Sequence, residues 1–467
     1  MNLRAKKLLS NTGLIAIGTF GSKILVFLLM PLYTSWLTTG EYGASEMIMS
    51  VSNFLIPIAA VGVSTGIFRF AAEREANKEA VFSSSVALLG IGLGVFLLLS
   101  PLLTLVDYCR EYVWLVVLYV ILADVHAVFS QYVRAIDRMA LFAVQGILNT
   151  ALVIVFNVVF LYFLKLGVIG YVLSVILGNL VTALFLFFKA RLWRVFSFEC
   201  VQKRLMGEIL RFSLPLIPTT LCWLITDLSD RAMVTYFWGE DVNGIYSAAY
   251  KIPTIVNLVS TVFLQAWQFS AISESSDEKE CSRFYSQVYS GFIAVIMIGT
   301  AGLILISRHV TSLLLNPAYH GANEFMPVLL CSVAMEAIVS FLASVYMVRK
   351  RSMRSFVTAL LGALSNVLLN LLLIPTVGAL GAALATLASY AIVMSVRLFD
   401  APRIIRFPRN LPRLALSLAL IFASAAAMTL QIPFMYLWAL GFTVLTVAIN
   451  APALLRCAKA LLRHRAA

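Results

Sequence analysis

Apolar residues dominate this chain in runs that are long enough to cross a membrane. A transmembrane helix needs about 20 predominantly apolar residues. Fourteen such runs are separated by short breaks that contain Gly, Pro or charged residues. They lie at about residues 11–36, 44–68, 80–106, 112–133, 140–163, 166–188, 210–235, 243–269, 284–306, 325–348, 355–375, 378–396, 412–430 and 433–455. The pattern therefore predicts an all-α integral membrane protein with about fourteen transmembrane helices.

The positions of the basic residues support this count and predict an orientation. If both termini are cytoplasmic, 29 of the 35 Lys and Arg residues fall in inside segments and 3 fall in outside segments. The other three, Lys23, Arg231 and Lys251, lie within spans. Cytoplasmic loops of membrane proteins carry an excess of Lys and Arg. One missed or added span would destroy this asymmetry, so we expect both termini on the cytoplasmic side.

Composition and motifs exclude several classes of protein. The chain is 61% hydrophobic and only 12% charged, with a mean hydropathy of +0.93, whereas soluble proteins are about 45–50% apolar and 25% charged. The net charge of +13 lies mostly in short inside segments and therefore does not predict a nucleic-acid partner. The six cysteines are scattered singly, which favours neither a zinc site nor a disulfide framework. No nucleotide-binding or hydrolase motif and no loop large enough for a catalytic domain occur, so we expect neither an enzyme nor a bound cofactor or metal.

Two halves of the chain share landmarks in the same order. Gly43 and Gly244 are the central residues of similar segments, 41–45 and 242–246, and are 201 residues apart. The segment from Gly167 resembles the segment from Gly378, 211 residues later. Each half holds six spans, so the repeat is parallel, and transporters of this kind bind substrate at the midplane between halves. We predict an N-terminal lobe, an amphipathic cytoplasmic connector, a C-terminal lobe, and a final pair of spans with a basic tail, at residues 1–190, 191–210, 211–398 and 399–467.

Three cations within the predicted spans are candidates for binding an anionic substrate. Charged groups inside a membrane are costly and often functional, and Lys23, Arg231 and Lys251 together would suit a diphosphate. The alternative is that each neutralises a carboxylate within the spans. The candidate pairs are Arg231 with Asp227, Lys251 with Asp230, and Lys23 with Glu46.

Other polar residues lie on the same or neighbouring spans. Asn53 belongs to a polar stripe on the second span with Glu46, Ser50 and Ser64, and Pro57 predicts a kink in this span. Tyr246 and Tyr250 could stack on sugars in a cavity, or form part of an interfacial aromatic belt. Asp124 and Glu336 are candidates for coupling transport to H⁺ or Na⁺, as are Glu46, Asp227 and Asp230. Asp124 and Glu336 could equally be protonated structural residues.

Several segments resemble the polysaccharide-repeat (O-antigen type) flippases of the multidrug/oligosaccharidyl-lipid/polysaccharide exporter superfamily. The resemblance lies in residues 11–23, 31–34, 41–43, 214–218, 230–231, 244–252 and 265–268. It implies a V-shaped, alternating-access bundle in the bacterial inner membrane. It also implies a polyprenyl-pyrophosphate-linked oligosaccharide as cargo, with a polysaccharide polymerase and assembly proteins as partners. By this resemblance, Lys23, Arg231 and Lys251 match positions of cavity cations.

Three alternatives remain open from the sequence. A drug or cation antiporter of the same superfamily would share the fold, although Lys23 and Lys251 count against it. A peptidoglycan-precursor flippase would differ only in the head group that it carries. A polyprenyl-dependent transferase would be a membrane enzyme, and the lack of a large loop and of clustered acidic metal ligands counts against it.

Overall fold

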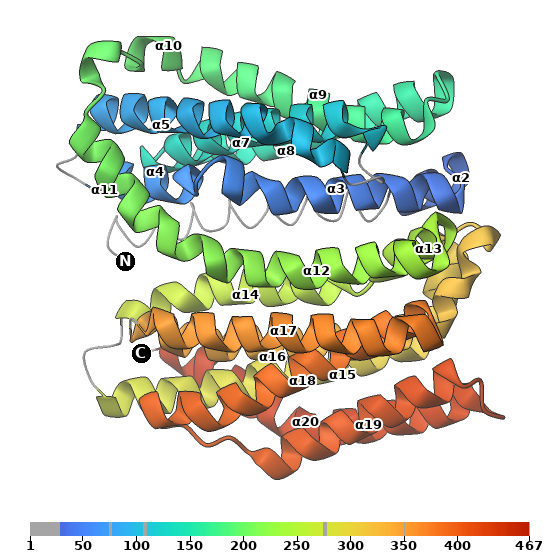
Figure 1. Cartoon of the computed structure of the whole chain (residues 1–467). Coiled ribbons are helices and arrows are strands. Elements are labelled where there is room, and N and C mark those ends of the chain that lie inside the picture. The colour runs from blue at the N-terminus through green and yellow to red at the C-terminus, as the bar shows by residue number, and fades with distance from the viewer. Residues whose placement is uncertain (1–28, 74–76, 106–109, 274–277, 350, 467) are drawn as a thin grey trace. The chain divides into compact units, whose positions relative to one another are not determined.

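The computed structural model describes residues 29–73, 77–105, 110–273, 278–349 and 351–466. These residues form helices joined by short turns, and the described part of the chain contains no strand (Figure 1). The chain divides into two compact units, Met1–Leu228 and Ser229–Ala467. The division falls within a single helix, α12 (Ile217–Trp238), and each unit is described below by itself.

The first unit consists of long helices with short 3-10 and π segments. In chain order they are α2 (Met30–Trp36), α3 (Thr39–Ala59), α4 (Val63–Ala71), α5 (Lys78–Leu99), η1 (Ser100–Leu105), α7 (Val113–Ala135), α8 (Met139–Asn157), η2 (Val158–Phe163), α9 (Gly167–Lys189), α10 (Leu192–Val195), η3 (Phe198–Cys200), α11 (Lys203–Ser213) and η4 (Leu214–Leu216). Side chains set some of the helix starts. Thr38 and Glu41 form a reciprocal capping box at the start of α3, and Asn77 caps α5.

The predicted second span is broken rather than straight. Its two halves, α3 and α4, meet at an angle of 52°. Pro57 lies inside the last turn of α3 and cannot donate a backbone hydrogen bond. Val61 and Gly62 then adopt left-handed φ values of 49° and 67°. The close approach of α5 also requires a glycine, because a Cβ at Gly92 would lie 2.4 Å from the carbonyl oxygen of Ala59.

The second unit is also built of long helices. After α12 they are α13 (Glu240–Lys251), α14 (Thr254–Ser273), α15 (Glu278–Leu314), η5 (Pro317–Glu324), α16 (Met326–Val348), α17 (Ser352–Val377), α18 (Ala379–Ile404), α19 (Leu411–Thr429) and α20 (Met435–Ala466). The predicted eighth span is divided between α13 and α14 at Ile252–Pro253. The core of the unit is α16, which packs against α14, α15, α17, α18 and α19.

The all-α, multi-pass class predicted from the sequence is confirmed. Within the described ranges, eleven helices are long and apolar enough to cross a membrane, or twelve if the bent α3–α4 pair is one span. Large apolar side chains such as Leu98 and Leu105 are 81% and 78% exposed, as expected where lipid is the solvent. The first predicted span, 11–36, lies mostly outside the described residues, and the span at 243–269 is not among the eleven. The total of fourteen therefore stays a prediction, as do the boundaries at 190, 210 and 398.

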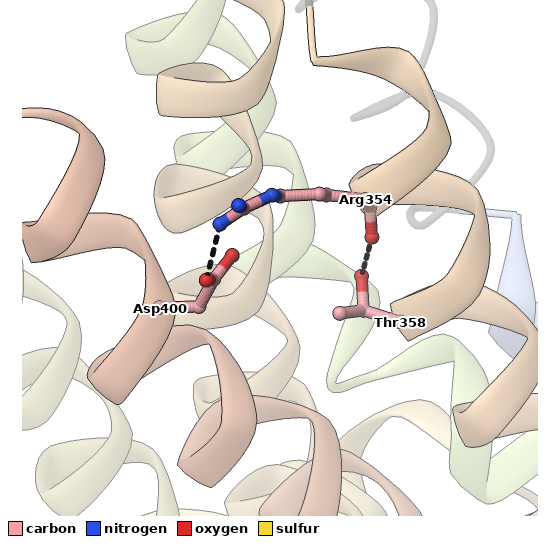
Figure 2. Close-up of polar contacts among 3 residues, drawn as sticks. All are labelled: Arg354, Thr358 and Asp400. Atoms are coloured by element: carbon pink, nitrogen blue, oxygen red, sulfur yellow. Dashed lines mark hydrogen bonds and ion pairs between the residues drawn. The ribbon is translucent and has the colours of Figure 1, made fainter.

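A set of polar contacts joins α17 and α18 to each other and to the middle of α16. Arg354 and Asp400 form an ion pair of 2.5 Å, and the Thr358 hydroxyl donates to the Arg354 carbonyl at 3.0 Å (Figure 2). Arg397 is 1% exposed and donates to Thr358 and to the carbonyl of Val339 on α16. These contacts hold α16, α17 and α18 together.

The connector predicted at 191–210 forms α10, η3 and α11. Its basic side chains Lys203, Arg204 and Arg211 are exposed, while Ile209 and Ser213 are buried against α4. A Cβ at Gly66 of α4 would lie 2.7 Å from each of these two side chains. The connector therefore packs directly on the second half of the broken span.

Candidate functional site

Two clusters of buried polar side chains contain most of the candidate residues that the structure describes. One lies in each unit. Lys23 lies outside the described residues, so its predicted role in binding an anion stays a prediction.

The cluster in the second unit is centred on Asp230. Its carboxylate is 3% exposed and accepts hydrogen bonds from four neutral donors. One oxygen accepts from the hydroxyls of Thr386 at 2.6 Å and Tyr246 at 2.9 Å. The other accepts from the amides of Asn370 at 2.7 Å and Asn366 at 3.2 Å. This many donors stabilise a buried negative charge, which would otherwise be very costly.

Four helices contribute the side chains of this cluster. Asp230 is on α12, Tyr246 on α13, the two asparagines one turn apart on α17, and Thr386 on α18. The side-chain oxygen of Asn370 is buried and has no hydrogen-bond partner among the described residues, while its amide nitrogen faces the carboxylate. The sequence analysis missed Asn366, Asn370 and Thr386, although two asparagines at a spacing of four in an apolar span are a detectable signal.

Arg231 lies next to this cluster. Its side chain is 6% exposed, its Nε donates to the Ser247 hydroxyl at 3.3 Å, and its guanidinium lies 5.8 Å from the centroid of the Tyr250 ring. Tyr250 and Lys251 are half-buried, at the end of α13 where the eighth span breaks. The structure thus brings Arg231, Tyr246 and Tyr250 together within the second unit.

The cluster in the first unit is centred on Glu46 of α3. Glu46 is 4% exposed, and its Oε1 accepts a hydrogen bond from the Tyr171 hydroxyl at 2.9 Å. The Tyr171 ring lies edge-on to Tyr33 and Tyr42, with centroids 5.2 and 5.9 Å apart. Asn157 of α8 donates to the Tyr33 hydroxyl at 3.1 Å. The tyrosines and Asn157 were not identified as site residues from the sequence.

Asn53 and Asp227 also make contacts in the first unit. Asn53 is exposed, and its side-chain oxygen accepts a hydrogen bond from the Tyr119 hydroxyl at 3.3 Å. The Ser50 hydroxyl donates to Asp227 at 3.3 Å. Ser50 and Asn53 belong to one polar stripe of α3, which agrees with the pattern seen in the sequence.

The two remaining carboxyl candidates differ in their contacts. Asp124 on α7 is 1% exposed, and neither of its oxygens has a hydrogen-bond partner in the part of the chain that the structure describes. Glu336 on α16 is half-buried and accepts from the Asn257 amide at 2.8 Å. Within the described ranges, no three His, Cys, Asp or Glu side chains are placed to share a metal ion.

The comparisons with known proteins connect this chain with transporters. Residues 8–269 match the family described as polysaccharide biosynthesis protein. No curated protein matches the sequence significantly. Among solved structures, the lipid II flippase MurJ in an inward closed conformation is similar, with a TM-score of 0.70 and 17% identity over 94% of this chain and 98% of that one.

Other similar structures are transporters of the MOP superfamily. An outward-facing multidrug resistance transporter of the MATE family and MOP superfamily gives a TM-score of 0.64 and 16% identity over 85% of this chain and 95% of that one. A MOP superfamily transporter from Pyrococcus furiosus gives 0.63 and 17% over the same shares. Identities this low show the fold alone. These matches agree with the prediction of a transporter rather than an enzyme.

Proposed function

The chain belongs to the polysaccharide biosynthesis protein family, and from that premise we propose that it is a flippase for lipid-linked oligosaccharides. It would move undecaprenyl-pyrophosphate-linked repeat units from the cytoplasmic to the outer leaflet of the bacterial inner membrane, with both of its termini in the cytoplasm. The cargo would serve the synthesis of a cell-surface polysaccharide of the O-antigen, capsule, exopolysaccharide or teichoic-acid type. A polysaccharide polymerase and assembly proteins are the expected partners.

The observation that carries this proposal is the family match over residues 8–269. The fold supports it, because a lipid II flippase matches over almost the whole length of both chains. Cavity cations would bind the diphosphate of the head group, and Lys23, Arg231 and Lys251 are the candidates. Asn53, Tyr246 and Tyr250 are the candidates for contacts with sugars. Tyr246 is 1% exposed and its hydroxyl bonds to Asp230, so of the two rings the half-buried Tyr250 is the better placed to meet a sugar.

We also propose that Asp230 binds the ion that couples transport to a gradient, either H⁺ or Na⁺. Hard cations prefer oxygen ligands, and the cluster offers the carboxylate, the Thr386 hydroxyl and the unpartnered Asn370 oxygen. Asp230 is next to Arg231 in the chain, so loading of this site would change the field at the neighbouring cation. If Na⁺ binds, NaCl should raise the thermal stability of the purified protein above that in choline chloride. Asp230→Asn should remove this difference.

Deletion of the gene in its host tests the flippase proposal. Undecaprenyl-pyrophosphate-linked repeat units should accumulate on the cytoplasmic leaflet, and their mass would identify the sugars. Normal surface polysaccharide without accumulated intermediates would contradict the proposal.

The match to a lipid II flippase favours one second candidate, the transport of peptidoglycan precursors. Rescue of cells depleted of their own precursor flippase would support this candidate. Export of a dye in a pump-deficient strain would instead identify a drug antiporter.

A further inference from the structure

Asp124 and Glu336 occupy corresponding places in the two halves of the chain. They are 212 residues apart, and the landmark glycines Gly170 and Gly381 are 211 residues apart. Asp124 lies on α7, in the fourth predicted span, and Glu336 lies on α16, in the tenth. Glu336 accepts a hydrogen bond from Asn257, whereas neither oxygen of Asp124 has a hydrogen-bond partner. The two carboxyls therefore differ in hydrogen bonding, although they lie at similar places in the sequence of the two halves.

The broken second span lies at the same level along the bundle as Asp124. Two contacts set the register of α7 against the α3–α4 pair: Tyr119 donates to Asn53, and Arg134 lies 4.7 Å from the centroid of the Phe68 ring. The two contacts are 15 residues apart along α7, from Tyr119 to Arg134, and 15 residues apart along α3–α4, from Asn53 to Phe68. Asp124 therefore lies level with the last turn of α3 and the break that follows it. No described side chain hydrogen-bonds to Asp124 in the way that Asn257 does to Glu336.

Charged and titratable groups of α7 and of the helices packed on it are engaged elsewhere or exposed. Glu46 accepts from Tyr171, Arg69 pairs with Glu73, His126 bonds to Gln145, and Arg134 lies against Phe68 and Phe142. At the helix ends, the exposed groups are Lys78, Glu79, Arg138 and Lys189. Among the residues that the structure describes, an ionised carboxylate at 1% exposure would find neither a hydrogen-bond donor nor a cation to stabilise it. A bound proton removes that cost.

We propose that Asp124 is a proton-binding site of the transport cycle. In the conformation described here the side chain holds its proton as a carboxylic acid. When the α3–α4 hinge moves and admits water, the O–H bond breaks, the proton passes to water and the carboxylate remains in a hydrated position. This inference rests on the proposed transport function and adds a titrating residue in the first unit, separate from the ion site at Asp230.

Chemical labelling tests the site without any substrate. A hydrophobic carbodiimide reacts with protonated carboxyls in apolar surroundings and forms a stable adduct that peptide mass spectrometry locates. Purified protein should be labelled at Asp124 at acidic pH and less at alkaline pH, and Asp124→Asn should lose this adduct. Glu336→Gln should leave the adduct at Asp124 unchanged. Absence of an adduct at Asp124 at every pH, with labelling at other carboxyls, would overturn the proposal.

Two substitutions separate a proton site from a structural residue. Asp124→Asn and Asp124→Leu should leave the melting temperature nearly unchanged, because the carboxyl makes no hydrogen bond. Both should lower transport at least about tenfold and flatten its pH dependence, and Asp400→Asn, at a helix end, should keep the pH response. Wild-type pH dependence in both Asp124 variants would overturn the proposal. If the wild type labels at Asp124 in a pH-dependent way but does not move lipid-linked sugars, the proton site stands and the proposed cargo is wrong.

Discussion

The buried carboxylates Glu46 and Asp230, one in each unit, differ in the side chains that surround them. Each accepts a hydrogen bond from a tyrosine hydroxyl at 2.9 Å. Each cluster draws its side chains from the first, second, fifth and sixth predicted spans of its half. In the first unit the other members are largely tyrosine rings, whereas in the second they are amides and a hydroxyl. Among the described residues, the Asp230 carboxylate is surrounded by amide and hydroxyl groups from three other helices, and oxygens of this kind are the ligands that hard cations prefer.

Removal of the Asp230 carboxylate should lower the free energy of unfolding more than any other change considered below. Asp230→Ala leaves the hydroxyls of Tyr246 and Thr386 without their acceptor, whereas the amides of Asn366 and Asn370 keep other acceptors. Because buried unsatisfied groups each cost about 1–3 kcal/mol, the free energy of unfolding should fall by about 3 kcal/mol or more. Thermal unfolding in detergent measures the change, and transport should be lost with it. A stable, active Asp230→Ala protein would remove the basis for treating this cluster as the ion site.

A substitution beside the broken span of the first unit should have the next largest effect on stability. Gly92→Ala places a Cβ 2.4 Å from the Ala59 carbonyl oxygen, whereas a Cβ at Gly90 on the same helix meets nothing within 4 Å. Gly92→Ala should therefore destabilise the protein by about 1–3 kcal/mol, and Gly90→Ala should be neutral or slightly stabilising. Equal melting temperatures for the two variants would show that the break does not pack on α5 as described.

The two tyrosines test the comparison directly. Tyr171→Phe removes the hydroxyl that Glu46 accepts from, and hydrogen bonds to charged groups contribute about 1.5–3 kcal/mol. Tyr246→Phe leaves Asp230 with three other donors, so its cost should be about 1 kcal/mol. Denaturation of the two variants side by side measures the difference. A larger cost for Tyr246→Phe would reverse the contrast between the clusters.

Loss of the ion pair between Arg354 and Asp400 should have the smallest effect on stability. Their side chains are 50% and 23% exposed, and exposed ion pairs contribute about 0–1 kcal/mol. Arg354→Ala should therefore change the melting temperature little, and less in high salt. A large loss of stability would indicate that the pair helps to hold Arg397 in its buried position.

The sequence predicted the fold class well because the signal is local. Each apolar run encodes its own helix, and the distribution of Lys and Arg constrains the number of crossings. The cluster at Asp230 was less predictable, since its amide donors Asn366 and Asn370 lie 136 and 140 residues away in the chain. The break at Val61–Gly62 was anticipated only as a kink at Pro57. The sequence pointed to Asp124, but only the packing of α7 shows that its carboxyl has no donor.

Reconstitution into liposomes tests the central claim most directly. Purified protein is combined with a fluorescent polyprenyl-diphosphate oligosaccharide, and loss of signal to an impermeant quencher reports movement between leaflets. We expect the wild type to exceed protein-free liposomes at least about tenfold, and the double variant Lys23→Ala and Lys251→Ala to fall close to the protein-free rate. No acceleration by stable wild-type protein under any ion gradient would contradict the flippase assignment, and full activity of the double variant would contradict the role of the two lysines.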